Sequence, residues 1–513
     1  MRHILEVIPI SAGLTYRPAG WTRRDGEGFM LKKSTAAIMI VAALLCGSLL
    51  TLAATGTIFT GQAVGESAAP AAAAGGGLKQ SEANKLGTAL TLIEGNYYKD
   101  VDRSKLIDGA VNGMMEALGD PYSNYMAKET AQQFEESIEG SFSGIGAEVA
   151  SDNGKVVVVS PIKGSPAEKA GIQAKDVIVS VNGESLQGLD LNDAVAKIRG
   201  PKGSTATLVV QRSGSSQPMT FNIKRDDVKL ETVYAKMENG GVGVIEITQF
   251  SMNTADRFKE ELSKLEKQGM KGLVIDVRND PGGVLPVVIE IAEQFVPKGK
   301  TIVQVENKAK EREETNSKGS GKDYPVAVLM NKGSASASEI LAGALQQSAG
   351  AKLIGENSFG KGTVQTSFEK QLGDGSLLKI TIAKWLTPDG SWIHGKGIKP
   401  DIAVAQPDYF SVSPINKSVT LQYNSNSSDV KSAQIMLAGL GYKPGRKDGY
   451  FDTATKEAVK KFQSASKLTV TGAIDAKTAE ALETALIKAI QSPVNDNQRN
   501  RGIEEIRKEI AAK

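Results

Sequence analysis

Two short segments hold the residue types that could form an active site in this chain of 513 residues. Residues 331–339 read NKGSASASE, a run of small and hydroxyl-bearing residues placed before a predicted helix. Residues 359–365 read FGKGTVQ and set Lys361 between two glycines. A serine hydroxyl becomes an effective nucleophile only when a nearby base removes its proton. The chemistry open to the first segment therefore depends on the bases that the chain can bring to it.

Histidine and cysteine are scarce in this chain, which contains two histidines and one cysteine. His3 precedes an apolar segment and Cys46 lies inside it, so neither is expected to reach a folded catalytic body. A Ser-His-Asp or Cys-His site would depend on His394 alone, and the sequence has no HExxH-type or cysteine-rich zinc motif. Serine with lysine as its base is the best remaining option for nucleophilic chemistry.

Ser336 has two interpretations. The stretch from Ser336 to Glu339 fits an S-x-x-E capping box, which alone would explain a serine at a helix start. The same position lies beside unpaired helix N–H groups that can hold an oxyanion, which suits a nucleophile. The two roles are hard to combine, because a hydroxyl bonded to a helix amide is badly placed to attack.

Lys361 is also ambiguous by itself, since a lysine in a glycine turn is commonly a surface residue. A lysine base would need its usual pKa of about 10.4 lowered by about three pH units, which costs about 4 kcal/mol. Desolvation can produce a change of that size. Gln365 lies four residues further on, on the same side of a strand or a helix, where its carbonyl oxygen could orient the amine.

Charge and the N-terminal region predict the location of the protein. The formal net charge is +3 with the basic residues spread out, so nothing indicates a nucleic-acid partner. An apolar run of about seventeen residues follows Lys32 and Lys33 and extends to Leu52, with basic residues on its N-terminal side. We expect a single-pass membrane anchor with an extracytoplasmic body, or a secreted protein if the segment is cleaved. Met30 would make a more ordinary start than Met1.

The pattern of apolar residues changes along the chain and suggests nine regions. Continuous apolar strands between helices indicate a largely parallel sheet covered by helices. The expected regions are a cytoplasmic segment (1–29), an anchor (30–60), an Ala/Gly linker (61–78), a helical region (79–135), a β-rich domain (136–228), an α/β core (229–404), a linker (405–427), a compact unit (428–487) and a charged helical tail (488–513).

The two segments together resemble the carboxy-terminal processing peptidases, also called tail-specific proteases. In that family the central serine of the SASASE run is the nucleophile and the lysine of the FGKG segment is the base, and the spacing of 25 residues matches. The resemblance implies that Ser336 attacks, Lys361 takes its proton and Gln365 orients the lysine. Some members carry an aspartate about eleven residues after the nucleophile, but this chain has Gln347 there, so no such aspartate is expected.

The resemblance also implies an oxyanion hole and a fold. The hole would use the Ala337 amide and one amide from residues 276–283, which read DVRNDPGG, and the sequence leaves Gly282 and Gly283 equally open. The implied fold is an α/β multidomain protein. It combines a crotonase-like α/β protease core with an inserted β-rich PDZ domain, an N-terminal helical segment and a small helical C-terminal domain. His394 is expected to be a bystander, because residues 395–401 resemble a family segment near the end of the core.

Residues 136–228 resemble a PDZ domain, although a plain β-rich scaffold would give a similar pattern. The resemblance makes residues 141–146 the loop that binds a C-terminal carboxylate, and the strand that follows would accept a peptide as an added strand. Leu191, Val195 and Ile198 would wall the side-chain pocket or face the core. The predicted substrate-binding residues are Phe142, Ser143, Gly144, Ile145, Gly146, Leu191 and Val195.

Residues 428–487 resemble a peptidoglycan-binding domain through segments such as DGYFD at 448–452 and VKKFQ at 459–463. The combined resemblances imply an exported serine endopeptidase that cleaves proteins recruited by their C-termini and is held at the cell wall. They imply no metal or organic cofactor, and they allow a homodimer. Two rivals stay open, a noncatalytic PDZ and wall-binding adaptor and an acyl-transfer enzyme that acts on thioesters. The partner of residues 428–487 could also differ from wall polymer.

Overall fold

The computed structural model describes residues 77–152, 154–212, 215 and 217–513. Helices and one short strand occupy the region predicted to be helical. These elements are α2 (Gln80–Asn96), α3 (Arg103–Glu116), β1 (Asn124–Met126) and α4 (Lys128–Glu139). Gly140 ends α4 in the left-handed conformation with φ of 67°, which glycine adopts without a steric penalty.

The predicted membrane location needs correction. The apolar run inside residues 30–60, on which that prediction rested, lies outside the described residues. Among the residues that the structure describes, no helix has the length and apolar character needed to cross a bilayer. A run of about seventeen residues is at the lower limit for a span. The prediction of a single-pass membrane protein with an N-terminal anchor is therefore wrong.

The β-rich domain is a small antiparallel sheet with two helices. Its sheet has the order β3-β4-β5-β7-β8, with β6 added to β5, and a separate ribbon pairs β2 with β9. A buried cluster that includes Val158, Ile178, Leu208 and Ile198 fills its interior. The elements are β2 (Ser141–Gly144), β3 (Ala147–Asp152), β4 (Lys155–Pro161), α5 (Pro166–Ala170), β5 (Val177–Val181), β6 (Glu184–Ser185), α6 (Leu191–Ile198), β7 (Thr205–Gln211), β8 (Met219–Lys224) and β9 (Asp226–Lys229).

The α/β core is built on a six-stranded sheet of order β10-β11-β12-β15-β16-β19. The last five strands are parallel and β10 pairs antiparallel at one edge, so the largely parallel sheet expected from the sequence is confirmed. The elements are β10 (Val233–Glu238), β11 (Val242–Ile247), α7 (Thr254–Lys267), β12 (Gly272–Asp276), α8 (Leu285–Ala292), β15 (Val326–Met330), α9 (Ala337–Ala349), β16 (Lys352–Gly355) and β19 (Ile402–Ala403). A second, antiparallel sheet joins β1 to β13 (Thr301–Asn307), β14 (Arg312–Asn316), β17 (Thr363–Phe368) and β18 (Leu377–Leu386).

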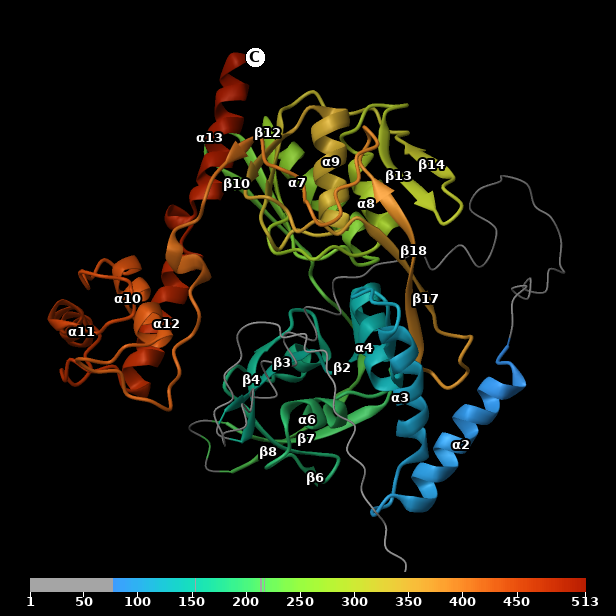
Figure 1. Cartoon of the computed structure of the whole chain (residues 1–513). Helices are drawn as coiled ribbons and strands as arrows, with labels where there is room; N and C mark the ends of the chain where they lie inside the picture. Colours follow the sequence, from blue (N-terminus) through green and yellow to red (C-terminus); the bar gives the residue numbers. More distant parts are fainter. Residues whose placement is uncertain (1–76, 153, 213–214, 216) are drawn as a thin grey trace, which may run out of the picture. The chain divides into compact units, whose positions relative to one another are not determined.

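Both faces of the parallel sheet are covered by helices, because alternate strand residues point to opposite sides. Leu273, Ile275 and Val328 belong to the cluster that contains residues of α7, α8 and α9. Val274 and Leu329 belong instead to a cluster with residues of α13 (Asn497–Ala512). The C-terminal helix therefore supplies the second layer of the core, and it lies beside β12 (Figure 1).

A small helical domain lies in the sequence between β19 and α13. Its interior contains Val430, Leu437, Phe451 and Phe462. Asp452 and Asp475 cap two of its helices by accepting amide hydrogen bonds, as short polar residues do at helix starts. The elements are η1 (Asp408–Ser411), α10 (Ser428–Gly439), α11 (Thr453–Ala465), α12 (Ala476–Gln491) and η2 (Pro493–Asn495).

Candidate active site

Ser336 stands at the junction between a buried strand and a helix. Strand β15 ends at Met330, a tight turn follows, and Ser336 is the residue that precedes α9. Its backbone has φ of 55° and ψ of −112°, an arrangement that residues other than glycine adopt only when surrounding contacts enforce it. Its exposed fraction is 4%. The fold thus fixes one serine in a strained, sheltered position.

The two neighbouring serines hold this turn in place. The Ser334 hydroxyl donates to the carbonyl oxygen of Val277 at 2.7 Å, and the Ser338 hydroxyl donates to that of Asp280 at 2.9 Å. The Ala335 amide donates to the same Asp280 oxygen at 3.1 Å. These bonds join the serine turn to residues 276–283, so Ser334 and Ser338 have structural roles.

The turn that contains Gly282 and Gly283 (residues 276–283), called the glycine turn below, lies directly against Ser336. A Cβ atom on Gly282 would lie 2.9 Å from the Ser336 Cβ and 2.9 Å from the Ala337 amide nitrogen, so only glycine fits. The Gly282 N–H donates to the Asp280 carboxyl at 2.8 Å. Within the described part of the chain, the N–H groups of Ala337 and Gly283 have no acceptor. This difference favours Gly283 over Gly282 as the second oxyanion donor.

Burial raises the pKa of Asp280 well above its ordinary value, against the hydrogen bond from Gly282. Its second carboxyl oxygen, Oδ2, is buried and has no hydrogen-bond partner among the described residues. An ionised carboxylate would be costly there, so a protonated Asp280 suits the site better. The turn is therefore organised by a neutral acceptor.

The segment around Lys361 threads through a tight space. A Cβ on Gly360 would lie 2.8 Å from the Gly397 nitrogen, and one on Gly362 would lie 2.8 Å from Nε1 of Trp392. The lysine is fully buried, with an exposed fraction of 0%. The surface-lysine interpretation is wrong, because the two glycines admit the backbone to a site that water does not reach.

Gln365 lies on β17 and is also fully buried. Its Nε2 group donates to the hydroxyls of Thr363 at 2.9 Å and Thr381 at 3.2 Å. Its Oε1 atom is buried without a hydrogen-bond partner among the residues described. The two threonines therefore fix the amide so that one acceptor remains available.

Glu339 connects the serine segment to the lysine segment, and the sequence analysis gave it only a capping role. One carboxylate oxygen accepts from the amides of Ser336 at 2.9 Å and Lys361 at 2.8 Å. The other accepts from the Gly360 amide at 2.7 Å and the Ser358 hydroxyl at 2.6 Å. Four donors converge on one buried group, so residues far apart in the sequence are held together.

The pKa of Glu339 is raised by burial, and the hydrogen bonds from Ser358, Lys361, Gly360 and Ser336 act in the opposite direction. The Ser358 hydroxyl already accepts from the Ile398 amide at 2.6 Å, so it points its own hydrogen at Glu339. Because every partner donates, an ionised carboxylate, which only accepts, matches this site.

Aromatic residues complete the surroundings of Lys361, and Tyr122 was missed from the sequence. The Lys361 ammonium nitrogen lies 5.2 Å from the centre of the Tyr122 ring. His394 stacks on Trp392 with ring centres 5.2 Å apart and meets the edge of Tyr122 at 6.0 Å. The sequence analysis assigned Tyr122 only to a helical region (79–135), so nothing pointed to a place beside Lys361. His394 lies near the lysine segment and packs between rings.

The predicted carboxylate-binding loop of the β-rich domain has free amides. Within the described residues the N–H groups of Ile145 and Gly146 have no acceptor, whereas their carbonyl oxygens accept from Ala167 at 2.7 Å and Ile162 at 2.9 Å. The Ser143 hydroxyl is buried without a partner there. Phe142 lies under the Arg199 guanidinium at 5.0 Å, and Gly144 packs on the same ring.

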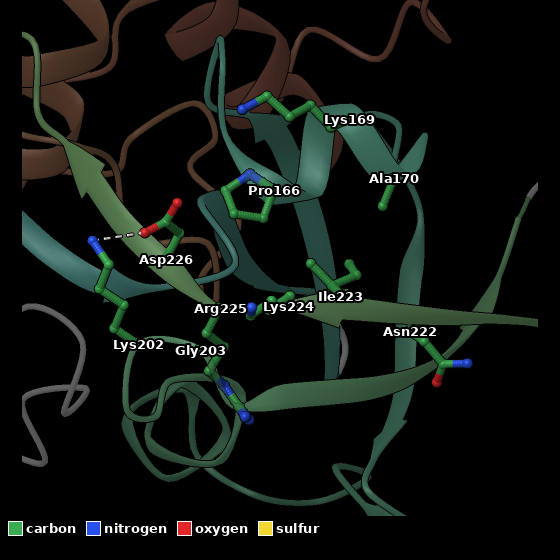
Figure 2. Close-up of a pocket in the computed structure, with 10 residues that line it drawn as sticks. All are labelled: Pro166, Lys169, Ala170, Lys202, Gly203, Asn222, Ile223, Lys224, Arg225 and Asp226. Carbon is green, nitrogen blue, oxygen red and sulfur yellow. Dashed lines mark ion pairs between the residues drawn. The ribbon is translucent and has the colours of Figure 1, made fainter.

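Leu191, Val195 and Ile198 share one face of α6, because they are spaced four and three residues apart. Leu191 and Val195 are half-buried, whereas Ile198 is buried in the domain core. A cavity of about 500 Å³ on the same domain, between α5, β8 and the loop before β7, is lined by none of the predicted peptide-binding residues (Figure 2). Its lining includes Lys169, Lys202 and Lys224, and Lys202 pairs there with Asp226 at 3.0 Å. The structure describes no group of three His, Cys, Asp or Glu side chains that could hold a metal ion.

Four stretches of this chain match known protein families. Residues 241–404 match peptidase family S41, 157–212 the PDZ domain, 426–482 a peptidoglycan binding domain, and 45–130 the N-terminal domain of the activating protease CtpB. The chain is 48% identical over 435 residues to the carboxy-terminal processing protease CtpB of Bacillus subtilis (strain 168), covering 84% of this chain and 90% of that protein. It is 44% identical over 431 residues to CtpA of the same strain, covering 84% and 91%.

Among solved structures, the photosystem II D1 C-terminal processing protease is 31% identical, with a TM-score of 0.37, over 61% of this chain and 85% of that one. The Bacillus relatives match nearly their whole length, and the family assignment rests on them. The resemblance and the fold class inferred from the sequence are confirmed. This chain is a serine-type peptidase that belongs to the carboxy-terminal processing proteases of family S41.

Proposed function

We propose that the protein is a Ser-Lys endopeptidase with Ser336 as nucleophile, Lys361 as general base and Gln365 as the residue that orients the lysine. The observation that carries this proposal is the Glu339 carboxylate, which accepts hydrogen bonds from the amides of both Ser336 and Lys361. Two segments of no sequence similarity are held on one buried anion. That arrangement suits a serine and a lysine that must act together.

Acylation begins when Oγ of Ser336 attacks the scissile carbonyl carbon and its proton passes to Nζ of Lys361. The negative oxygen of the tetrahedral intermediate accepts from the amides of Ala337 and Gly283. When the carbon–nitrogen bond breaks, the lysine returns the proton to the leaving amine. A water molecule, deprotonated by the same lysine, then hydrolyses the acyl-enzyme.

The lysine must be uncharged to accept a proton, and two features of its surroundings act in opposite directions. Complete burial penalises the ammonium form by several kcal/mol. The Tyr122 ring face favours that form by about 0.5–2 kcal/mol. Burial acts toward the neutral amine that the reaction requires. The Gln365 Oε1 atom would accept from the amine and hold it toward Ser336.

The other domains suggest how substrates arrive and where they are cut. The free amides of Ile145 and Gly146 suit the carboxylate of a protein C-terminus, with Leu191 and Val195 beside its last side chain. The match of residues 426–482 to a peptidoglycan binding domain supports action at the cell wall, which requires export. The substrate class is then exported proteins with accessible C-terminal tails.

Turnover of unfolded casein and of a tail-bearing protein tests the proposal. We expect turnover by the wild-type protein and its loss in Ser336→Ala and in Lys361→Ala, with Ser320→Ala, at an exposed serine outside both segments, as a control that keeps most activity. Equal turnover by the wild type and both variants would reject the assignment. An absence of turnover in all of them, together with tail-peptide binding, would favour the adaptor.

A further inference from the structure

Arg278 lies in the turn that leads to Gly282 and Gly283, and its guanidinium binds two carboxylates at once. It donates to Asp276 through Nε at 2.8 Å and Nη2 at 2.6 Å. It donates to Asp496 through Nη1 at 2.8 Å and Nη2 at 2.7 Å. The exposed side-chain fractions of Arg278 and Asp496 are 13% and 14%, so water screens this pair weakly.

Asp496 is held from the opposite side by the C-terminal part of the chain. It caps α13 by accepting from the Arg499 amide at 2.9 Å, and it accepts from Nε2 of Gln406 at 2.7 Å. Gln498, the second residue of α13, is fully buried and donates to the Val404 carbonyl oxygen at 2.8 Å. Asp496 is therefore a fixed point from which the turn can be held.

On this side Asn279 of the glycine turn is bonded to Asn331: its amide donates to the Asn331 Oδ1 at 2.9 Å and its own Oδ1 accepts from the Asn331 Nδ2 at 2.9 Å. A cavity of about 460 Å³ lies behind the turn, lined among others by Arg278, Asn279, Asn331 and Asp496. Side chains that border a cavity lack packing partners there. The two ion pairs of Arg278 act together with the Asn279–Asn331 bonds in fixing the outer part of this turn, and with the bond from Arg278 to Gln498 at 3.2 Å the pair with Asp496 connects the turn to α13.

We propose that Asp496 is a positioning residue for the peptidase reaction: by binding Arg278, it lets the docked helix α13 hold the turn whose glycine amide stabilises the oxyanion. The proposal rests on the Ser-Lys function proposed above. It makes the segment after the peptidoglycan-binding domain part of the catalytic unit, although the matched S41 region ends at residue 404. The peptidoglycan-binding domain is then an insertion within that unit.

The test compares two ion pairs on the same helix in the full-length protein. Asp496→Asn removes the negative charge that pairs with Arg278 but keeps a good helix cap. Arg499→Gln is the matched control, because Arg499 binds Glu238 on β10 at 2.6 Å with a similar exposed fraction of 15% and makes no contact with the turn. The measurements are kcat and KM on casein per titrated active site, labelling of Ser336 by a fluorophosphonate, and thermal unfolding.

We expect Asp496→Asn to lower kcat and the labelling rate about tenfold or more with little change in KM, since small misplacements of catalytic donors are costly. Arg499→Gln should lower the melting temperature about as much as Asp496→Asn does, and it should leave kcat within about twofold of the wild-type value. If both variants keep wild-type kcat per active site, or lose it equally, the proposal is overturned.

Two further arms keep the test decisive. If Asp496→Asn does not fold, Gln406→Ala, which removes one neutral hydrogen bond to Asp496, takes its place and should lower kcat by about threefold; an unchanged kcat then rejects the proposal. Wild-type turnover that is lost in Ser336→Ala must be established first. Its absence would reject the proposed function, whereas its presence with unaffected Asp496 variants would reject only the role of Asp496.

Discussion

The peptidase site and the loop of the PDZ domain both present free backbone amides, but the two are fixed in different ways. At the peptidase site the amides lie in turns organised by the buried carboxyl groups of Glu339 and Asp280. The PDZ loop has amides at Ile145 and Gly146 beside half-buried apolar side chains. An oxyanion hole works only when its donors are in place before the reaction, whereas strand addition tolerates adjustment to many peptides. The contrast distinguishes the proposed catalytic centre, which must be rigid, from the proposed recruiting surface, which can adapt.

The largest effect is expected from Glu339→Gln, which tests whether the proposed catalytic site depends on this buried carboxylate. Glutamine carries one oxygen and one N–H₂ group in place of the two carboxylate oxygens. Whichever oxygen the N–H₂ group replaces, two buried donors lose their acceptor. A loss of about 3 kcal/mol would lower kcat about 100-fold while KM changes little. Steady-state kinetics with casein, at protein concentrations corrected for folded fraction, measures it.

A matched control shows whether this loss is specific. Gln463 in the C-terminal helical domain is another buried hub, since its Oε1 accepts from the Thr471 amide at 3.0 Å and the Gly472 amide at 2.9 Å. Gln463→Ala should destabilise the protein and leave kcat unchanged. A similar fall in kcat for both variants would mean that Glu339 acts through global stability alone.

Val195→Asp tests the proposed peptide-binding surface of the PDZ domain. A carboxylate on the predicted pocket wall repels the carboxylate of an incoming C-terminus and disfavours its apolar side chain. We expect KM for a tail-bearing protein to rise about tenfold, while kcat on a short internal peptide stays the same. Val179→Asp, at an exposed valine of the same domain, is the control. An unchanged KM in Val195→Asp would place the peptide elsewhere.

Local patterns in the sequence were sufficient for the parts of the site that depend on neighbouring residues. The hydroxyl-rich turn, the glycine-flanked lysine and the alternation of strands and helices are short-range features, and the structure has all of them. Family resemblance then assigned roles to Ser336, Lys361 and Gln365, which remain proposals. The choice between Gly282 and Gly283 could not be made, because it depends on where the Asp280 side chain points.

Long-range contacts account for what the sequence did not predict. Glu339 fits a capping box locally, but its bonds to Gly360 and Lys361 come from a segment more than twenty residues away in the sequence. The predicted charged tail carries two apolar residues, Ile503 and Ile506, that pack on the sheet. The sequence analysis did not identify them. Strand β1 lies in a region predicted to be helical, since three residues are too few for a strand pattern.

A pH experiment sharpens the comparison at α4, whose Glu136 pairs with Arg199 beside the PDZ loop. On the same helix, burial and the neighbouring Glu369 raise the pKa of Glu135 from 4.5 to about 7. The folded state therefore binds this proton more tightly than the unfolded state, and the stabilisation present below pH 4.5 is lost as the pH rises through about 7.

Glu135→Gln should accordingly raise the melting temperature at pH 8, by about 1 °C because the group is partly exposed, and have little effect at pH 4. Thermal unfolding across this range measures the difference between variant and wild type. Glu129→Gln, at an exposed position of the same helix, is the control. If Glu135→Gln stabilises the protein equally at pH 4 and at pH 8, then burial and Glu369 do not raise the pKa of Glu135.

The smallest expected effect comes from Asp280→Asn, which asks whether the rigid site needs a charge at the glycine turn. Burial raises the pKa of Asp280 and so favours its neutral form, and an asparagine oxygen can still accept from the Gly282 amide. We expect kcat to change by less than about twofold, whereas Asp280→Leu, which removes the acceptor, should lower it about tenfold. The cost of ionising a buried carboxyl grows with pH, so the stability of Asp280→Asn relative to the wild type should rise with pH. A large loss of kcat in Asp280→Asn would instead mean that the turn depends on an anion, and that the oxyanion donors are set by charge as well as by geometry.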